Sequence, residues 1–187
     1  MSPDRLFLRH RPDPHGGPPS SDPGLRGWRR GAVLAAATGL GAGYAPVASG
    51  TFGGAVGMAL YLALAPWMTP WAYALAVLLL TAAAIPVATA AEGILGRKDD
   101  GRVVLDEVVG SLVTMIGAWG YIAGQPLGRQ AAVLAVGFVL ARLFDIVKPW
   151  PAHRLQALPG GWGIVADDFV AGLYSCVALH AVLAWVL

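Results

Sequence analysis

Beyond its first thirty residues, the chain consists of long apolar runs separated by short polar or Gly- and Pro-rich stretches. The run at residues 71–91 is the clearest, because a membrane-spanning helix needs about 20 predominantly apolar residues. The other apolar runs occupy residues 31–43, 55–66, 103–122, 130–147 and 169–187. The pattern predicts a polytopic membrane bundle of about four to five membrane segments. Residues 31–43 are predicted as a short re-entrant or interfacial helix, and residues 55–66 form the shortest of the predicted segments.

The composition agrees with a membrane location. Hydrophobic residues make up 56% of the 187 residues and charged residues 13%, whereas an ordinary soluble domain has roughly 25% charged residues. Residues 1–30 are the exception, because they are rich in Pro, Gly, Ser and charge and lack the apolar core of a signal peptide. They are predicted to form a disordered cytoplasmic tail, and residues 31–187 a single membrane-embedded domain.

Lysine and arginine are distributed unevenly among the predicted loops. They gather in the N-terminal tail and in the loops at residues 97–102 and 148–154, whereas the turn at residues 66–71 has none. The positive-inside rule then places the tail and both basic loops in the cytoplasm. The formal net charge is only +2 and no Lys/Arg block is interleaved with aromatic residues, so nucleic acid is not expected as a partner.

Five acidic side chains stand where apolar runs meet the basic loops, and the topology brings them to one face of the membrane. They are Asp106, Glu107, Asp145, Asp167 and Asp168. An aspartate at full membrane depth costs at least ~2.5 kcal/mol, so such residues usually face a polar cavity or a partner. Five carboxylates on one face match the oxygen ligands that Mg²⁺ prefers.

Two structural alternatives account for single members of this set. Asp106 and the pair before residue 169 stand at apparent helix starts, where a carboxylate caps backbone N–H groups. Asp145 has Arg142 and Lys148 three residues away on either side, so an ion pair on a shared helical face is its alternative. Capping requires one acid per helix rather than two, and it does not explain Asp145.

Candidates for binding a phosphate lie beside the acids. Arg142 and Lys148 supply positive charge next to Asp145. Gly161 and Gly163 stand in the stretch "PGGWGIVADD", where glycines can turn backbone N–H groups toward an anion at a helix start, and Thr51 belongs to a second Gly-rich turn, "SGTFGG". Together with the acids, these residues predict metal-assisted chemistry on a phosphate at the membrane surface.

Four motifs in order resemble those of the phosphatidylglycerophosphatase A family, and the resemblance covers roughly residues 31–187. They are "GTFG" at residues 50–53, "DEVVG" at 106–110, "DIVKPWP" at 145–151 and "GWGIVADDFVAG" at 161–172. One departure is Ser49, where many members carry proline before the Gly-Thr pair. The resemblance implies an all-α membrane phosphatase domain. It also implies a Mg²⁺-dependent enzyme that converts phosphatidylglycerol phosphate in the bilayer to phosphatidylglycerol, with its active site on the cytoplasmic face of a bacterial inner membrane.

The resemblance also implies roles for the candidate residues. The expected Mg²⁺ ligands, directly or through water, are Asp106, Glu107, Asp145, Asp167 and Asp168. The expected catalytic residues are Asp106, Glu107, Asp145 and Asp168, with either Glu107 or Asp168 as the general base on the attacking water. The expected substrate-binding residues are Thr51, Arg142, Lys148, Gly161 and Gly163.

The main alternative function is a small cation- or proton-coupled transporter that uses the same intramembrane acids. A transporter is expected to place its charges near mid-span, between broken helices. Here the charges lie at segment ends on one face, which favours an interfacial enzyme.

Overall fold

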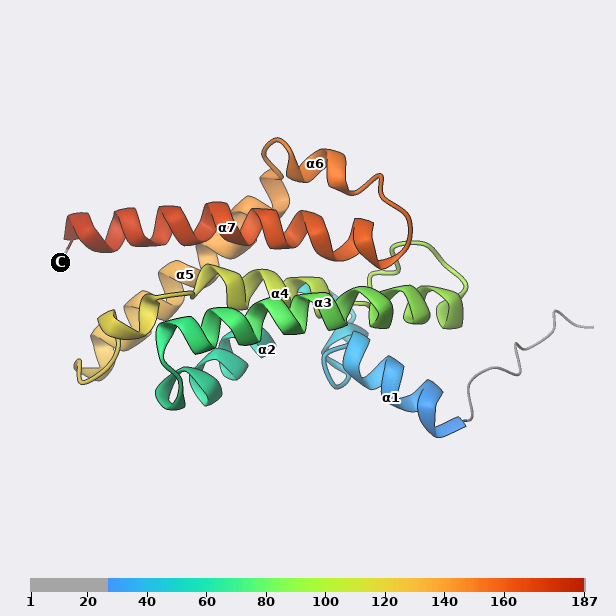
Figure 1. Cartoon of the computed structure of the whole chain (residues 1–187), viewed down its shortest axis with the longest axis horizontal. Coiled ribbons are helices and arrows are strands. Elements are labelled where there is room, and N and C mark those ends of the chain that lie inside the picture. Colours follow the sequence, from blue (N-terminus) through green and yellow to red (C-terminus); the bar gives the residue numbers. More distant parts are fainter. Residues whose placement is uncertain (1–26, 187) are drawn as a thin grey trace, which may run out of the picture.

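The computed structural model describes residues 27–186, and within this range every regular element is a helix, as the all-α prediction requires (Figure 1). The predicted tail therefore falls outside the described residues, except for residues 27–30, which begin the first helix. The α-helices are α1 (Gly27–Ala37), α2 (Ser49–Leu64), α3 (Pro70–Leu95), α4 (Leu105–Thr114), α5 (Leu127–Val147), α6 (Ala152–Leu155) and α7 (Gly161–Val186). Three short 3-10 helices are η1 (Ala42–Tyr44), η2 (Ala65–Trp67) and η3 (Ala118–Tyr121).

Three helices, α3, α5 and α7, are long and apolar enough to cross a membrane. They contain 26, 21 and 26 residues and include three of the predicted segments. The total of four to five membrane segments and the re-entrant helix at residues 31–43 are not confirmed. α2, which contains the predicted segment at residues 55–66, has 16 residues, and α1 has 11.

The apolar run at residues 103–122 forms the short central helix α4 rather than one long helix. α4 has ten residues and a length of about 15 Å, roughly half the thickness of a bilayer's hydrocarbon core. The chain leaves the helix after Thr114, and Gly117 adopts a left-handed conformation with φ +77° before η3 begins. This run is apolar because neighbouring helices bury it, rather than because it contacts lipid.

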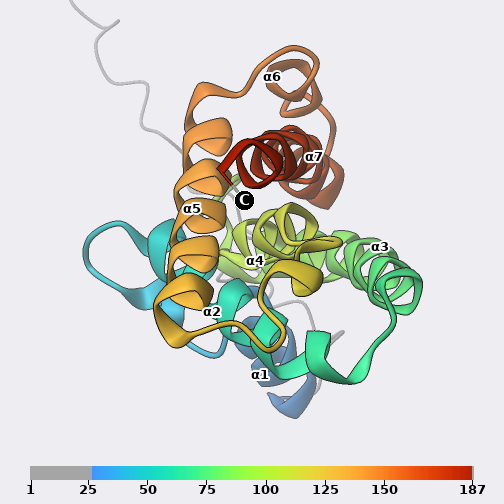
Figure 2. The same cartoon turned by 90° about the vertical axis from the view of Figure 1, so that its left-hand side faces the viewer.

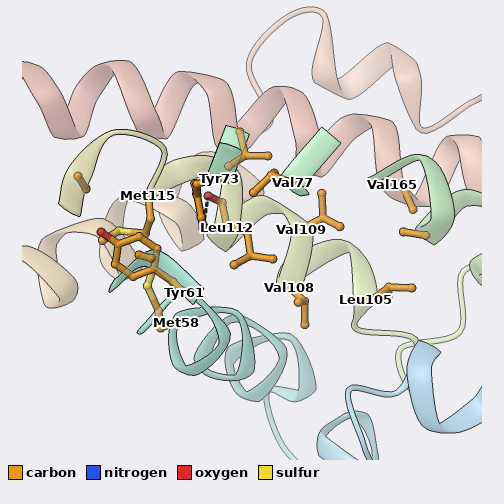
Figure 3. Packing of buried hydrophobic residues seen from close by; sticks show 14 of the residues in the cluster. Met58, Tyr61, Tyr73, Val77, Leu105, Val108, Val109, Leu112, Met115 and Val165 are labelled. Carbon is orange, nitrogen blue, oxygen red and sulfur yellow. Dashed lines mark hydrogen bonds between the residues drawn. The ribbon is translucent and has the colours of Figure 1, made fainter. Parts of the chain in front are cut away.

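α4 lies among four other helices, α2, α3, α5 and α7, and Figure 2 shows it near the middle of the bundle. Its side chains from Val108 to Thr114 are all buried. Figure 3 shows Val108, Val109 and Leu112 among the buried core residues, with Tyr61 of α2 and Tyr73 of α3 nearby. The Tyr73 hydroxyl donates to the Leu112 carbonyl oxygen at 2.9 Å, which anchors α3 to α4.

Glycines allow the helices around α4 to approach closely. A Cβ atom at Gly57 of α2 would lie 2.7 Å from Ser111 Cβ and 2.9 Å from the Val108 carbonyl oxygen. On the opposite side, a Cβ atom at Gly172 of α7 would lie 2.8 Å from the Gly110 carbonyl oxygen. Small residues at such contacts are typical of membrane helix packing, where backbones must approach closely to gain van der Waals contact.

α7 begins at Gly161 rather than near residue 169, which corrects the predicted boundary of the last segment. Gly161 packs against α3, because a Cβ atom there would lie 2.0 Å from the Ile85 carbonyl oxygen. Its backbone N–H donates to the Thr89 hydroxyl at 2.8 Å and so gives a helix-end N–H group a partner. Asp167 and Asp168 therefore lie inside the helix, in its second turn, and not ahead of it.

Candidate active site

Three charged residues gather at the end of α5. Arg142 and Asp145 lie in its last turns, and Lys148 is its C-cap residue. Arg142 Nη1 lies 2.7 Å from Asp145 Oδ2, and Lys148 Nζ lies 3.2 Å from Asp145 Oδ1. The ion pair that the three-residue spacing offered as the structural alternative for Asp145 is therefore present, and it forms with both neighbours.

Lys148 also connects α5 to α7. Its ammonium group forms ion pairs with Asp167 and Asp168, the latter at 3.2 Å. Burial alone lowers the pKa of Lys148, but the carboxylates of Asp168 and Asp167 outweigh burial and raise this pKa above its usual value. The side chain therefore keeps its positive charge and joins three carboxylates from two helices.

The backbone of Lys148 is unusual for a residue with a side chain. It adopts a left-handed conformation with φ +43°, which costs a non-glycine residue roughly 1–2 kcal/mol. Glycine is the residue most often found at this position after a helix. Such strain persists where the surroundings hold the residue in place, and here the ion pairs with Asp145, Asp167 and Asp168 do so.

α4 contributes two adjacent acids from its first turn, Asp106 and Glu107. Burial and the neighbouring Glu107 carboxylate raise the pKa of Asp106 well above its usual value, and burial and Asp145 raise that of Glu107. Glu107 Oε1 lies 3.9 Å from Arg142 Nη1, so α4 and α5 face each other through opposite charges. The N-cap of α4 is Val104, which has no side-chain capping bond, so Asp106 is not the N-cap residue.

Three carboxylate oxygens in this region are buried and lack a hydrogen-bond partner among the described residues. They are Asp106 Oδ1, Glu107 Oε2 and Asp167 Oδ1. A buried polar atom without a partner is costly and calls for an explanation, such as an ion or a ligand that completes its environment.

Each of the five predicted acids lines one of two small cavities, and Lys148, which lines the first, is ion-paired with Asp145 and Asp168, which line the second. The larger cavity measures about 60 Å³, and its lining includes Asp106, Lys148 and Asp167. The smaller measures about 10 Å³, enough for about one water molecule, and its lining includes Glu107, Arg142, Asp145 and Asp168. The convergence that topology predicted therefore occurs among α4, α5 and α7.

Several residues of the larger cavity were not predicted from the sequence, among them Lys98, Asp99 and Gln156. Lys98 comes from the loop between α3 and α4, whose basic residues were expected only to mark the cytoplasmic side of the membrane. The short distance along the chain from Lys98 to Asp106 was a usable signal for its presence in the site. Gln156 follows the short helix α6, and nothing in its sequence context marks it.

The Gly-rich stretches were predicted to bind phosphate, but in the structure most of their predicted groups do not face the cavities or are already hydrogen-bonded. Thr51 is exposed in the first turn of α2, and it is the preceding Gly50 that meets the site, since a Cβ atom there would lie 2.1 Å from Glu107 Oε1. Gly163 lines the larger cavity, but its N–H donates to the Gly160 carbonyl oxygen. The N–H of Gly161 is likewise occupied, by Thr89.

The loop before α4 is tied to the start of α2 by the residue that departs from the family pattern. The Ser49 hydroxyl donates to the Gly101 carbonyl oxygen at 2.7 Å. In the same loop, Arg102 donates from Nε and Nη2 to the Asp100 carboxylate at 2.8 and 2.7 Å. Neither Asp100 nor Arg102 lines either cavity, so this pair is a contact of the loop itself.

The donor set fits Mg²⁺, which prefers oxygen ligands and usually takes one or two carboxylates together with water and a substrate phosphate. The buried oxygens of Asp106, Glu107 and Asp167 without partners are suitable donors. Among the described residues, however, no three His, Cys, Asp or Glu side chains are close enough together to enclose an ion by themselves. The arrangement therefore suits an ion that is bound by few protein ligands and completes its coordination with a phosphate and water.

Comparisons with known proteins show which family the sequence resembles. A sequence model of the phosphatidylglycerophosphatase A family matches residues 35–183. A Bacteroides thetaiotaomicron protein named putative phosphatidylinositol-3-phosphatase is 36% identical over 154 residues, which cover 80% of this chain and 92% of that protein. Phosphatidylglycerophosphatase A of Escherichia coli is 29% identical over 151 residues, covering 77% and 79% of the two chains.

A third relative, phosphatidylglycerophosphatase A of Haemophilus influenzae, is 34% identical over 94 residues, covering 50% of this chain and 53% of that protein. No solved structure matches the chain significantly. The family match spans α2 to α7, and so includes every acid and cation of the site described above. The chain belongs to the phosphatidylglycerophosphatase A family of phosphatases.

Proposed function

We propose that this protein hydrolyses the terminal phosphate monoester of phosphatidylglycerol phosphate and releases phosphatidylglycerol and inorganic phosphate. The observation that carries the proposal is the meeting of five carboxylates with Arg142 and Lys148 at the ends of α5 and α4 and in the second turn of α7. Family membership and the names of two relatives support the substrate.

The two cations suit the recognition of a phosphate monoester. Arg142 presents a planar set of donors that matches phosphate oxygens, and Lys148 adds a compact charge between two helices. Both stabilise negative charge that develops on the phosphoryl oxygens during transfer to water. Lys98 stands at the larger cavity and supplies a third positive charge to an entering phosphate.

The acids divide between holding an ion and moving a proton. Asp106 and Asp167, which each place an unpartnered oxygen at the larger cavity, are the residues proposed to hold Mg²⁺ together with water and the substrate phosphate, with Glu107, Asp145 and Asp168 nearby. When bound, Mg²⁺ polarises a phosphoryl oxygen and helps to orient the attacking water. Glu107 or Asp168 accepts the proton of that water, because both line the smaller cavity, which has room for about one water molecule.

The proposed location is the bacterial inner membrane, with the site on the cytoplasmic face. The two basic loops predicted to be cytoplasmic contain Lys98 and Lys148, and both residues line the same cavity. The site and the basic loops therefore lie at the same end of the bundle, which supports a cytoplasmic active site.

The test is phosphate release from phosphatidylglycerol phosphate in detergent micelles, with Mg²⁺ and with a chelator. We expect Mg²⁺-dependent release that Asp145→Asn abolishes without unfolding the protein, because this change removes the charge shared by Arg142 and Lys148. The matched control is Asp100→Asn, which also removes a carboxylate paired with an arginine but lies outside both cavities.

Two outcomes would overturn the proposal in different ways. Full activity of the Asp145→Asn variant would remove Asp145 from the mechanism. Hydrolysis of phosphatidylinositol 3-phosphate in preference to phosphatidylglycerol phosphate would keep the lipid phosphatase and replace its substrate with the one in the name of the Bacteroides relative.

A further inference from the structure

A third cavity, of about 180 Å³, lies between the end of α2, the start of α3 and the segment that leads from α4 into η3. Figure 3 shows its residues Tyr61, Tyr73 and Met115 together at one end of the core. A cavity of about 150 Å³ is enough to hold a benzene molecule. We refer to the space as the Tyr61 cavity, and its main lining residues are Tyr61, Ala65, Pro70, Tyr73, Met115 and Trp119.

The Tyr61 cavity and the active site lie at opposite ends of α3. Pro70, the first residue of α3, lines the Tyr61 cavity, whereas Lys98, in the loop that follows α3, lines the 60 Å³ cavity of the active site. The 26 residues of α3 extend about 39 Å, more than the thickness of a bilayer's hydrocarbon core of about 30 Å. Trp67 and Trp71, each 86% exposed, stand beside the start of α3, as tryptophans do at a membrane interface. The Tyr61 cavity therefore belongs to the membrane face opposite the active site.

The floor of the Tyr61 cavity holds a hydroxyl group without a partner. Tyr61 is only 1% exposed, and its Oη atom is buried without a hydrogen-bond partner among residues 27–186. The other hydroxyl of the floor is already used, since Tyr73 donates to the Leu112 carbonyl oxygen at 2.9 Å. A buried hydroxyl that makes no hydrogen bond is costly. The Tyr61 hydroxyl therefore calls for an occupant that brings an acceptor oxygen.

The rest of the lining requires this occupant to be uncharged and largely apolar. Among the described residues, none that lines the cavity is charged. The rings of Tyr73 and Trp119 meet the Tyr61 ring edge to face, with centroid distances of 5.6 and 6.3 Å. Ala65 and Met115 complete the buried part of the wall. A phosphate group would lose its water here with no cation to replace it.

The Tyr61 cavity is open to the surface of the bundle. Pro70, Gly117 and Gly120 line the cavity and are themselves exposed, so they form its rim. Two of these three residues are glycines, so the rim has no side chain at these positions to cover the opening. A membrane lipid beside the start of α3 can therefore insert part of its structure without a movement of the helices.

We infer that the Tyr61 cavity binds a phospholipid of the leaflet opposite the active site. An ester carbonyl oxygen of the lipid accepts a hydrogen bond from the Tyr61 hydroxyl, and the first part of the acyl chain lies against Tyr73, Met115 and Trp119. Ester carbonyls are uncharged acceptors, and they lie between headgroups and hydrocarbon, which is the level that interfacial tryptophans occupy. This lipid is a ligand rather than the substrate, and the inference does not depend on the proposed phosphatase activity.

The experiment compares two lipids that differ only in the acceptor. Full-length protein in a mild detergent is freed of lipid and titrated with a diester phosphatidylcholine or with the diether phosphatidylcholine of the same chain length, which lacks both carbonyl oxygens. The readouts are the rise in melting temperature, because a ligand of the folded state stabilises it, and the amount of bound lipid in native mass spectra.

Three variants separate the hydroxyl from the cavity. Tyr61→Phe removes the unpartnered donor alone, and Ala65→Leu fills part of the buried wall. Tyr73→Phe is the matched control, because it also removes a buried hydroxyl from this cavity, but one that is already bonded to Leu112.

We expect wild-type protein to bind the diester lipid about tenfold more tightly than the diether lipid, as one hydrogen bond to a buried hydroxyl implies. Tyr61→Phe should abolish this preference, Tyr73→Phe should retain it, and Ala65→Leu should weaken the binding of both lipids. Equal affinities of wild-type protein for the two lipids would overturn the inference. A preference that persists in Tyr61→Phe would also overturn it, because the carbonyl would then be recognised elsewhere.

A labelling measurement keeps the inference testable if Tyr61→Phe does not fold. Wild-type protein is photolabelled with a phosphatidylcholine that carries a diazirine beside one ester. Labelling of residues 61–73 and 115–120 that excess diester lipid suppresses more strongly than diether lipid supports the inference. Equal suppression by the two lipids would refute it, since it would show contact with bulk lipid only. Suppression by a lipid quinone and by neither phospholipid would also refute it and assign the cavity to another carbonyl compound.

Discussion

Gly50→Ala tests the position of Glu107 without altering any charged residue. Gly50 lies in the first turn of α2 and has no side chain between its backbone and Glu107. A Cβ atom at this position would lie 2.1 Å from Glu107 Oε1 and 3.1 Å from Arg142 Nη1. Because an ordinary contact needs at least 3.4 Å, the Glu107 carboxylate must move by more than about 1 Å.

The size of the effect follows from what has to move. The obstructing oxygen is the far end of a flexible side chain, so the fold can accept the methyl group, and we expect the free energy of unfolding to change by only about 0.5 kcal/mol or less. A misplacement of about 1 Å at a reacting group can cost on the order of 10²-fold in rate. Gly50→Ala should therefore lower kcat by about two orders of magnitude with an almost unchanged melting temperature.

Gly57→Ala provides the opposite case on the same helix. Its Cβ atom would meet Ser111 Cβ at 2.7 Å and the Val108 carbonyl oxygen at 2.9 Å, and neither atom can rotate away. Overpacking of this kind typically costs about 1–3 kcal/mol, or several degrees in melting temperature. Gly93→Ala is the neutral control, because a Cβ atom at Gly93 has no neighbour within 4 Å.

Both properties can be measured on purified protein in detergent, by phosphate release and by thermal unfolding. Wild-type kcat in Gly50→Ala would show that the position of Glu107 does not matter to the reaction. A loss of stability in Gly50→Ala as large as that in Gly57→Ala would show that Glu107 cannot move aside. It would refute the argument that this change affects the active site without destabilising the fold.

Three further predictions concern charges. Lys98→Ala should raise KM about tenfold with little change in kcat, because a cation at the cavity mouth binds the phosphate equally before and during reaction, while Arg97→Ala should change neither in the same assay. In Mg²⁺-free detergent, the raised pKa of Asp106 means that the folded chain binds more protons than the unfolded chain above about pH 4. The free energy of unfolding therefore falls as pH rises. Asp106→Asn should flatten this dependence in thermal melts between pH 5 and 8. Hydrogen bonds from Arg102 lower the pKa of Asp100 to about 2, so its stabilisation is present above about pH 4 and disappears as pH falls through 2. Asp100→Asn should cost about 0.5–1 kcal/mol at pH 7, as the Arg102 side chain is 43% exposed, and should match the wild type near pH 2 in chemical unfolding.

The three long helices were predictable because a long helix surrounded by lipid or by apolar side chains requires a long apolar run in the sequence. The same argument explains the difference at residues 103–122. A helix buried by its neighbours is as apolar as one in lipid, so the composition of this run could not reveal that α4 ends at Thr114. The early start of α7 at Gly161 also escaped prediction, because its first turn depends on the Ile85 carbonyl and the Thr89 hydroxyl of α3.

In the candidate site, too, contacts within one helix could be expected from the sequence, whereas contacts between helices could not. The ion pairs of Asp145 follow from the helical repeat alone, so the spacing of Arg142 and Lys148 already indicated them as the structural alternative for this residue. The contacts of Lys148 with α7 bring together residues about twenty positions apart and depend on the packing of two helices. Gln156 reaches the cavity for a similar tertiary reason, and no local pattern marks it.

The length of α7 sets the depth at which the chemistry takes place. Its 26 residues extend about 39 Å, and the hydrocarbon core of a bilayer is about 30 Å thick, so α7 standing perpendicular to the bilayer would extend roughly 9 Å into the headgroup layer. Asp167 and Asp168 lie about 9–10 Å from the start of the helix at Gly161. With the projection at the Gly161 end, the two carboxylates lie level with the upper edge of the hydrocarbon, where the phosphates and glycerol of the lipids are found. In this placement a lipid substrate reaches the acids by lateral diffusion, and the lipid product leaves the same way, while only inorganic phosphate has to pass into water.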